Sequence, residues 1–152
     1  MTDGMRRREV LAVAGAGLAL APLPWRAALA DDDAARRAIA EVLGDADAVR
    51  EGRVAFNAPA VADNGAMVPV KVVVDSPMTE ADHVTAIHVF APQNPRAFIA
   101  AFHLSPLMGR AEVQTRIRLG RTQRVLAVAT LSDGTRWSGA AEVRVTLGGC
   151  KS

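Results

Sequence analysis

Alternation of apolar and polar residues at every second position is the feature that most constrains how this chain can fold. Successive side chains of a β-strand point to opposite faces, so an alternating segment has one core face and one solvent face. Residues 112–119 show this pattern clearly, with Val113, Ile117 and Leu119 on one face and Glu112, Gln114 and Arg116 on the other. Similar segments predict strands at 53–57, 67–74, 84–91, 97–104, 123–131 and 142–147. Segments 84–91 and 97–104 are apolar on both faces, which is typical of central strands.

Turn-forming residues separate these segments, as in Asp63-Asn64-Gly65, Asp75-Ser76-Pro77 and Ser132-Asp133-Gly134. About seven short strands so closely spaced predict an all-β protein, an immunoglobulin-like β-sandwich. Pro69 cannot donate a backbone hydrogen bond, which predicts an edge position or a bulge in strand 67–74. We expect the large core side chains to be Phe56, Phe90, Phe98, Phe102 and Trp137.

A single short helix is predicted before the first strand, over residues 32–44. Asp32 or Asp33 can cap its N-terminus, apolar residues recur near helical spacing, and Gly44 ends it. Residues 31–147 therefore form one domain with one core, a size that suits a single sandwich.

Residues 1–30 are predicted to be an export signal. Arg7 and Arg8 are followed by one free position and two apolar residues, which is the twin-arginine pattern. The apolar segment 10–23 is shorter than the roughly 20 residues that a membrane-spanning helix needs. Ala28-Leu29-Ala30 supplies a signal-peptidase site. We expect export to the periplasm by the twin-arginine route and no membrane anchor.

The predicted mature chain carries no net charge. The 18 basic and 16 acidic residues of the whole chain include four arginines and two acids within residues 1–30, which leaves 14 of each sign. Nucleic-acid-binding proteins need a basic surface to neutralise phosphates, so this composition argues against nucleic acid as a partner.

Catalytic and metal-binding patterns are weak in this sequence. Asp75, Glu80 and Asp82 fall in a predicted loop, where solvated turn residues are the simpler interpretation. The three histidines, His83, His88 and His103, lack the spacing of a zinc site, and we expect each to be a hydrogen-bonded structural residue. His88 and His103 could still meet across a sheet, which leaves a metal enzyme open as a weaker alternative. We expect no catalytic residues, no metal and no cofactor.

The C-terminal tail, residues 148–152, carries the only cysteine, Cys150. Gly148 and Gly149 restrict the backbone very little and place Cys150 roughly 10 Å beyond Leu147 when extended. Lys151 is a candidate for tuning the thiol, because a neighbouring positive charge favours the nucleophilic thiolate. An exposed thiol in an oxidising compartment either carries chemistry or pairs between chains, so an exported binding or structural module with an intermolecular disulfide is the alternative.

Several segments in order along the chain resemble the SoxY family, the cysteine-bearing subunits of the sulfur carrier in bacterial thiosulfate oxidation. They are the twin-arginine signal, 74–82 (VDSPMTEAD), 86–91 (AIHVFA), Asn94-Pro95, Phe102-His103, 109–113 (GRAEV), 115–119 (TRIRL) and Gly148-Gly149-Cys150.

The resemblance implies a flexible arm formed by Gly148 and Gly149, with sulfur attached covalently to Cys150. It also implies a heterodimer with a second β-sandwich subunit, SoxZ. The expected enzymes are the c-type cytochrome complex SoxAX, the SoxB sulfate thiol hydrolase and a sulfur dehydrogenase. The family ends Gly-Gly-Cys-Gly-Gly, whereas Lys151 and Ser152 replace the two closing glycines here. Lys151 could attract an anionic sulfur compound, or its bulk could obstruct the narrow clefts that the arm enters.

Overall fold

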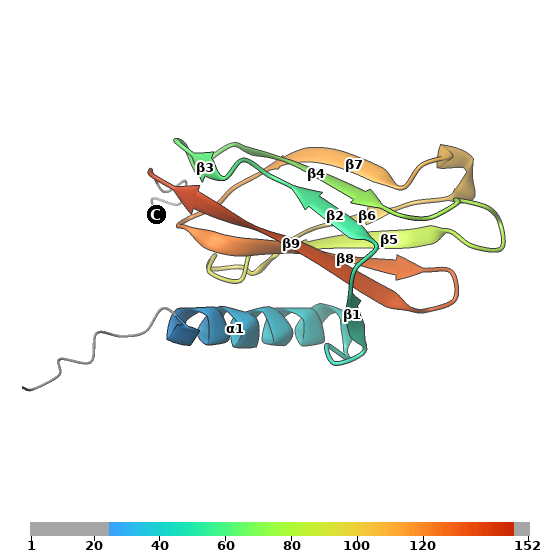
Figure 1. Ribbon diagram of the computed structural model, residues 1–152, viewed down its shortest axis with the longest axis horizontal. Coiled ribbons are helices and arrows are strands. Elements are labelled where there is room, and N and C mark those ends of the chain that lie inside the picture. The colour runs from blue at the N-terminus through green and yellow to red at the C-terminus, as the bar shows by residue number, and fades with distance from the viewer. Residues whose placement is uncertain (1–24, 148–152) are drawn as a thin grey trace, which may run out of the picture.

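The computed structural model describes residues 25–147, with side chains described from residue 32 onward. Two sheets pack face to face, and one helix lies beneath the larger sheet (Figure 1). The all-β, immunoglobulin-like sandwich predicted from the alternation is confirmed. No helix within the described residues is both long and apolar enough to cross a bilayer.

The larger sheet has the strand order β1-β9-β8-β5-β6, and β3 pairs with β9 beside β1. Its strands are β1 (Val49–Glu51), β3 (Val61–Ala62), β5 (Val84–Phe90), β6 (Phe98–His103), β8 (Gln123–Leu131) and β9 (Arg136–Val145). The smaller sheet has the order β2-β4-β7, formed by β2 (Val54–Asn57), β4 (Val68–Val74) and β7 (Glu112–Ile117). A 3₁₀ turn, η1 (Pro106–Met108), joins β6 to β7.

Alternation places the core as predicted. Val68, Val70, Val72 and Val74 are each at most 4% exposed and face the interior from β4. The opposing sheet contributes Ile87 and Val89 of β5 and Val125, Ala127 and Ala129 of β8, all fully buried. Gly139 of β9 lies directly against the backbone of Val54, so a side chain there would collide with β2 where the two sheets approach.

The structure has nine strands within residues 25–147, rather than about seven. The two additional strands, β1 and β3, run parallel to β9 and contain three and two residues. Strands this short show no period that a sequence pattern could reveal. The last strand is also longer than predicted and begins at Arg136. The prediction missed this start because the mixed small and polar residues 136–141 obscure the alternation.

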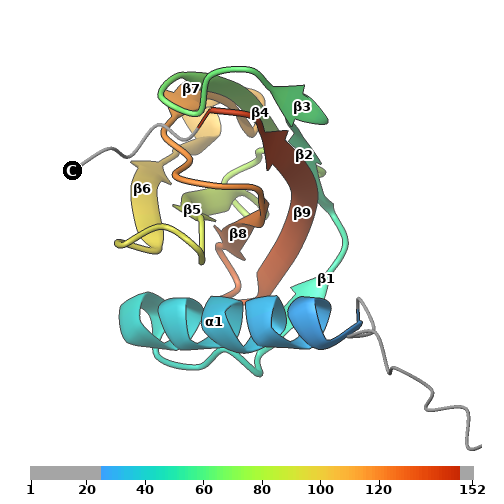
Figure 2. The same ribbon diagram turned by 90° about the vertical axis from the view of Figure 1, so that its left-hand side faces the viewer.

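Helix α1 (Trp25–Leu43) begins before the predicted residue 32, inside the segment interpreted as a signal. Asp32 and Asp33 are therefore within the helix and do not cap it. Alanine and leucine favour helix, which explains why the segment Trp25–Ala30 continues it. Ala35, Ala38 and Ile39 pack on the outer face of the larger sheet against Phe90, Leu126 and Val128. Figure 2 shows α1 lying across this face, apart from the smaller sheet.

Strand β6 is an edge strand, which corrects the prediction that 97–104 is central. None of its residues is buried, and only Ile99 and Phe102 pack against the core, both partly exposed. Phe98 is accordingly 40% exposed and not a core residue. Trp137 is also only partly buried, with the guanidinium groups of Arg50 and Arg53 each 5.7 Å from its ring. Phe56 and Phe90 are buried as expected, and Phe102 packs at the margin of the core.

Pro69 lies where β4 has a neighbour on one side only. It pairs with Arg116 of β7, whereas β2 pairs with residues 71–74. The prediction of an edge position is therefore confirmed locally, although β4 is the central strand of its sheet.

Candidate functional site: the root of the C-terminal arm

The predicted arm, with Gly148, Gly149, Cys150 and Lys151, lies outside the described residues. The structure describes its root, where Thr146 and Leu147 follow the end of β9. In Figure 1 this root lies at the end of the sandwich where β9 meets β3. The surroundings of these two residues determine how firmly an arm would be attached to the domain.

Backbone hydrogen bonds hold the root up to its last described residue. Thr146 donates its backbone N–H to the Ala62 carbonyl at 3.1 Å, and the Leu147 carbonyl accepts from Gly65 at 2.8 Å. Gly65 in turn accepts from the N–H of Leu119 at 2.7 Å. The root is therefore connected through one turn to the segment that follows β7, so the arm starts from a fixed point.

A second network holds the loops beside the root. The Asn94 side chain donates to the Arg118 carbonyl at 2.7 Å and accepts from the N–H of Gly120 at 3.0 Å. Gln123, which is only 2% exposed, donates to the Asn94 side chain and accepts from the Gln93 N–H, both at 2.9 Å. These bonds join loops 91–97 and 118–122, which are distant in sequence.

Thr122 connects this pair of loops to β9. The N–H of Val145, the last residue of β9, donates to the Thr122 hydroxyl at 2.9 Å. Sequence reasoning missed Gln123, Asn94 and Thr122 as supports of the root. A glutamine at the start of a strongly apolar strand was the one available signal, because a buried polar side chain needs partners.

The histidines lie away from the arm root. His88 and His103 occupy neighbouring strands, where His88 pairs with Ala101 and His103 with Ala86, so they are diagonal neighbours as anticipated. Burial lowers the pKa of His88, and its electrostatic interactions with His103 and Arg136 lower that pKa further. The buried Nδ1 of His88 has no hydrogen-bond partner, which corrects the expectation of a hydrogen-bonded residue. His83 fits that expectation, because its Nδ1 lies 3.0 Å from the Thr79 carbonyl.

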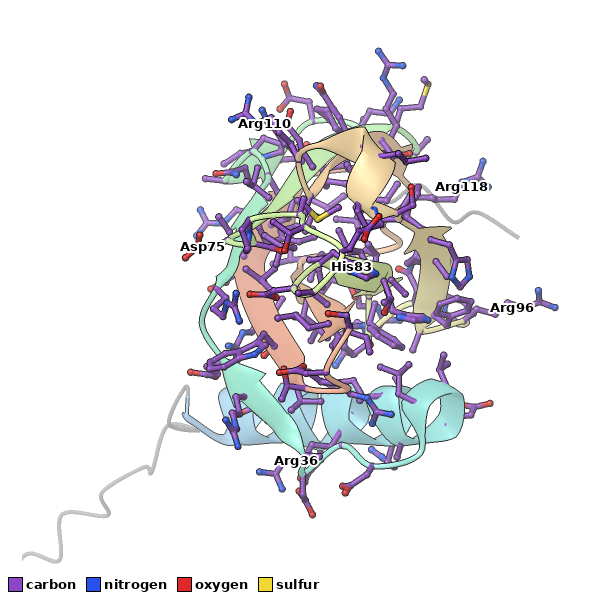
Figure 3. All side chains as sticks on the ribbon, turned by 90° about the vertical axis from the view of Figure 1, so that its right-hand side faces the viewer. Arg36, Asp75, His83, Arg96, Arg110 and Arg118 are labelled. Atoms are coloured by element: carbon purple, nitrogen blue, oxygen red, sulfur yellow. The ribbon has the colours of Figure 1, made fainter. Side chains whose placement is uncertain are left out.

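The remaining candidate residues do not assemble into a reactive centre. Asp75 and Glu80 are exposed and Asp82 is half-buried, in the loop after β4. Asp82 makes one long ion pair with Arg53, at 4.0 Å. Figure 3 shows Asp75 and His83 at the end of the molecule that faces the viewer. Within residues 25–147, no group of three or more His, Cys, Asp or Glu side chains could hold a metal ion.

Comparison with known proteins agrees with this description. The family model described as "Sulfur oxidation protein SoxY" matches residues 39–150, a range that ends at Cys150. The structure of the sulfur carrier protein SoxY from Chlorobium limicola f. thiosulfatophilum is 31% identical, with a TM-score of 0.61. The similarity covers 78% of this chain and 99% of that protein. No curated protein matches the chain significantly.

More distant structures share the fold alone. A superoxide reductase (neelaredoxin) from Ignicoccus hospitalis is 15% identical over 62% of this chain and 80% of its own, with a TM-score of 0.55. A putative superoxide reductase from Thermotoga maritima is 18% identical over 63% and 86%, with a TM-score of 0.51. The family match and the sulfur carrier structure cover most of the chain, and they show that this protein belongs to the SoxY family.

Proposed function

We propose that this chain is a periplasmic sulfur-carrier subunit that holds sulfur intermediates on Cys150 and presents them to partner enzymes. The observation that carries the proposal is the SoxY family match, which extends to Cys150, the only cysteine of the chain. The fixed arm root supports it, because a domain that delivers a thiol needs a firm attachment for a flexible arm. In this proposal the chain is a carrier and not an enzyme, and it uses no cofactor other than the sulfur it bears.

The chemistry on Cys150 would begin with an oxidation. The thiolate and thiosulfate form an S–S bond, giving Cys–S–S–SO₃⁻ and releasing two electrons to the c-type cytochrome complex. Water then attacks the terminal sulfur in a hydrolase. Sulfate leaves with two protons released, and Cys–S–S⁻ remains for further oxidation by a sulfur dehydrogenase. Lys151 would favour the thiolate needed in the first step.

The proposed partners follow from the same family. A SoxZ-like β-sandwich subunit would form a heterodimer with this chain, and the SoxAX complex, SoxB and the sulfur dehydrogenase would act on the arm in turn. The twin-arginine pattern supports this assembly, because that route exports folded proteins and could carry a partner without its own signal. Size-exclusion chromatography of the native periplasmic protein should give a heterodimer, and a fully competent monomer would refute the partner proposal.

The decisive experiment measures covalent loading. Intact mass spectrometry after incubation with thiosulfate and the oxidising cytochrome complex should show a gain of one S₂O₃ unit. The Cys150→Ser variant should show no gain and should not support thiosulfate-dependent respiration. Unchanged respiration in that variant would overturn the proposal.

The second candidate is a binding or structural module linked through a Cys150 disulfide, which the single cysteine favours. It predicts that the covalent dimer seen on non-reducing gels is the active form. Sulfur loading that reaches full capacity only after reduction would count against this module and in favour of the carrier.

A further inference from the structure

Charge is distributed unevenly along this chain, although the predicted mature protein is neutral. Between His83 and Ser132 the sequence contains one acidic residue, Glu112. The same segment contains six arginines, Arg96, Arg110, Arg116, Arg118, Arg121 and Arg124. The surface of a neutral protein usually mixes positive and negative side chains. The positions of these arginines in the fold therefore decide whether positive charge gathers on one part of the surface.

Four exposed arginines lie in the segments that form the arm root. Arg118 and Arg121 belong to the loop that Asn94 and Thr122 hold beside β9, and Arg96 follows Asn94 in the other loop. Arg144 pairs in register with Val61 near the end of β9. None of these four makes an ion pair with another described residue. Figure 3 shows Arg96 and Arg118 directed outward on the side of β6.

Exposed apolar side chains accompany them. Leu147 is 69% exposed, and Met67 is 62% exposed where β4 begins, next to the pairing of Val68 with Ile117. Met67 is thus close to Arg118 along the ladder of β4 and β7. We call this set the arm-root surface, which comprises Met67, Arg96, Arg118, Arg121, Arg144 and Leu147.

The opposite end of the sandwich has the reverse charge. The loops there contain the acidic residues Asp75, Glu80, Asp82 and Asp133 and the basic residues Arg53 and Arg110. The loops at the arm end, 58–67, 91–97, 118–122 and 146–147, contain one acidic residue, Asp63, and on β9 the exposed Glu142 lies on the same face as Arg144. The domain therefore carries excess positive charge at the end from which the arm leaves.

We infer that the arm-root surface docks onto an acidic protein surface surrounding the cleft of each enzyme that receives Cys150. This inference rests on the proposed carrier function. Unpaired guanidinium groups and exposed apolar side chains occur together at this end of the domain, and a protein interface combines the same two kinds of contact. A small sulfur anion would gain nothing from Met67 or Leu147, so a protein surface explains both parts of the pattern.

Electrostatic docking suits a carrier that must visit several enzymes and leave each one. Complementary charges accelerate encounter by 10–10³-fold and orient the approach, while two exposed apolar side chains do not hold the complex for long. The orientation matters because Cys150, three residues after Leu147, reaches only about 10 Å beyond it.

The test compares charge reversal at the arm root with charge reversal at the other end. Arg118→Glu and Arg121→Glu are measured singly and together. Arg110→Glu is the control at the opposite end: Arg110 is exposed, follows η1, makes no ion pair with a described residue and acts electrostatically on Glu112. The protein is used with its partner subunit, and thermal melting verifies the fold of each variant. The readout is kcat/KM for loading Cys150 by the cytochrome complex at low and high ionic strength.

We expect the double variant to lose about tenfold or more in kcat/KM at low ionic strength, with the difference shrinking as salt screens the charges. Arg110→Glu should remain close to the wild type. Two reagents then separate a protein partner from a small anion. In the double variant, the rate at which neutral iodoacetamide alkylates Cys150 should equal that of the wild type. Its reaction with the dianionic 5,5′-dithiobis(2-nitrobenzoate) should slow much less than enzymatic loading does.

Each other outcome overturns the inference. Equal losses in the arm-root and Arg110→Glu variants would show a general effect of net charge. Equal slowing of the enzyme and of the dianionic reagent would show that the surface serves small anions. A wild-type chain that loads normally, with rates independent of Arg118 and Arg121, would overturn this inference alone. A wild-type chain that accepts no sulfur would overturn the proposed function and the inference with it.

Discussion

At the scale of single residues, His88 is the titratable group that the fold perturbs most clearly by burial. Its ring lies on β5 with Phe98 at 6.2 Å between centroids, and the groups that act on it electrostatically are His103 on β6 and Arg136 on β9. Burial and the positive charges of His103 and Arg136 disfavour the protonated ring of His88. The pKa of His88 is therefore lower in the folded chain than in the unfolded chain.

The lowered pKa of His88 makes the stability of the fold depend on pH. Below the ordinary histidine pKa of about 6.5, the unfolded chain takes up a proton at His88 before the folded chain does. The contribution of His88 to stability is therefore complete above this pH and is lost as pH falls toward the lowered pKa of the folded state. We expect His88→Gln to flatten the loss of unfolding free energy between pH 7.5 and 5.5, measured by urea denaturation. His83→Gln, outside this pair of strands, serves as the control, and a slope unchanged in His88→Gln would contradict the prediction.

At the scale of elements, the loops beside the arm root depend on one side-chain network. Replacing Asn94 by alanine removes the acceptor of the Gly120 N–H and the donor to the Arg118 carbonyl, and leaves the buried Gln123 amide short of a partner. Because unsatisfied buried groups cost more than a hydrogen bond gains, we expect Asn94→Ala to lower the unfolding free energy by about 1–3 kcal/mol.

Asn64→Ala is the matched control for this change. Asn64 also accepts from a backbone N–H, that of Ala66 at 2.9 Å, but the bond is exposed and local. We expect its replacement to cost less than about 1 kcal/mol. Amide hydrogen exchange should show faster exchange at Gly120 in Asn94→Ala and not in Asn64→Ala. Equal losses in the two variants would mean that the network does not stabilise the loops beyond an ordinary turn.

The elements also show how far the sequence predicts this structure. Strands with a solvent face, such as β4 and β7, have a period of two that fixes both their position and their inward residues. The prediction for β6 was wrong, because apolar residues on both faces do not distinguish a central strand from an edge strand whose apolar side chains are partly exposed. Strands β1 and β3 are too short for any period, and α1 extends through residues whose composition also fits an export signal.

The candidate site also has a part that the sequence predicts and a part that only the fold reveals. Cys150 and its two glycines stay a prediction from the sequence, since they lie outside the described residues. The supports of the root could not be predicted, since Gln123 and Asn94 meet across a separation of 29 residues. The arginines of the arm-root surface come from three segments, and only the fold brings them to one end.

At the scale of the whole molecule, the contacts among residues 25–147 form one sandwich, and a single cysteine cannot form a disulfide within the chain. The hydrogen bonds at the end of β9 come from Val145, Thr146 and Leu147, which bind Thr122, Ala62 and Gly65. The proposed function needs the arm to move while the domain stays rigid. We therefore compare two truncated chains, one ending at Leu147 and one ending at Val145. Both should lose sulfur loading, but only the shorter one should lose stability.

We expect a chain ending at Leu147 to melt within about 2 °C of the complete chain, because it keeps every hydrogen bond described at the root. It should nevertheless take up no sulfur, since it lacks Cys150. A chain ending at Val145 also loses the backbone bonds from Thr146 to Ala62 and from Gly65 to Leu147, worth about 1 kcal/mol each, and the exposed bond from the Thr146 hydroxyl to the Asp63 carbonyl. For a domain of this size that loss should lower the melting temperature by roughly 5–10 °C.

Differential scanning calorimetry of both truncations provides the measurement. Equal melting temperatures for the two would show that the root is not fixed to the sandwich, and a large drop in the longer one would show that the arm itself stabilises the fold.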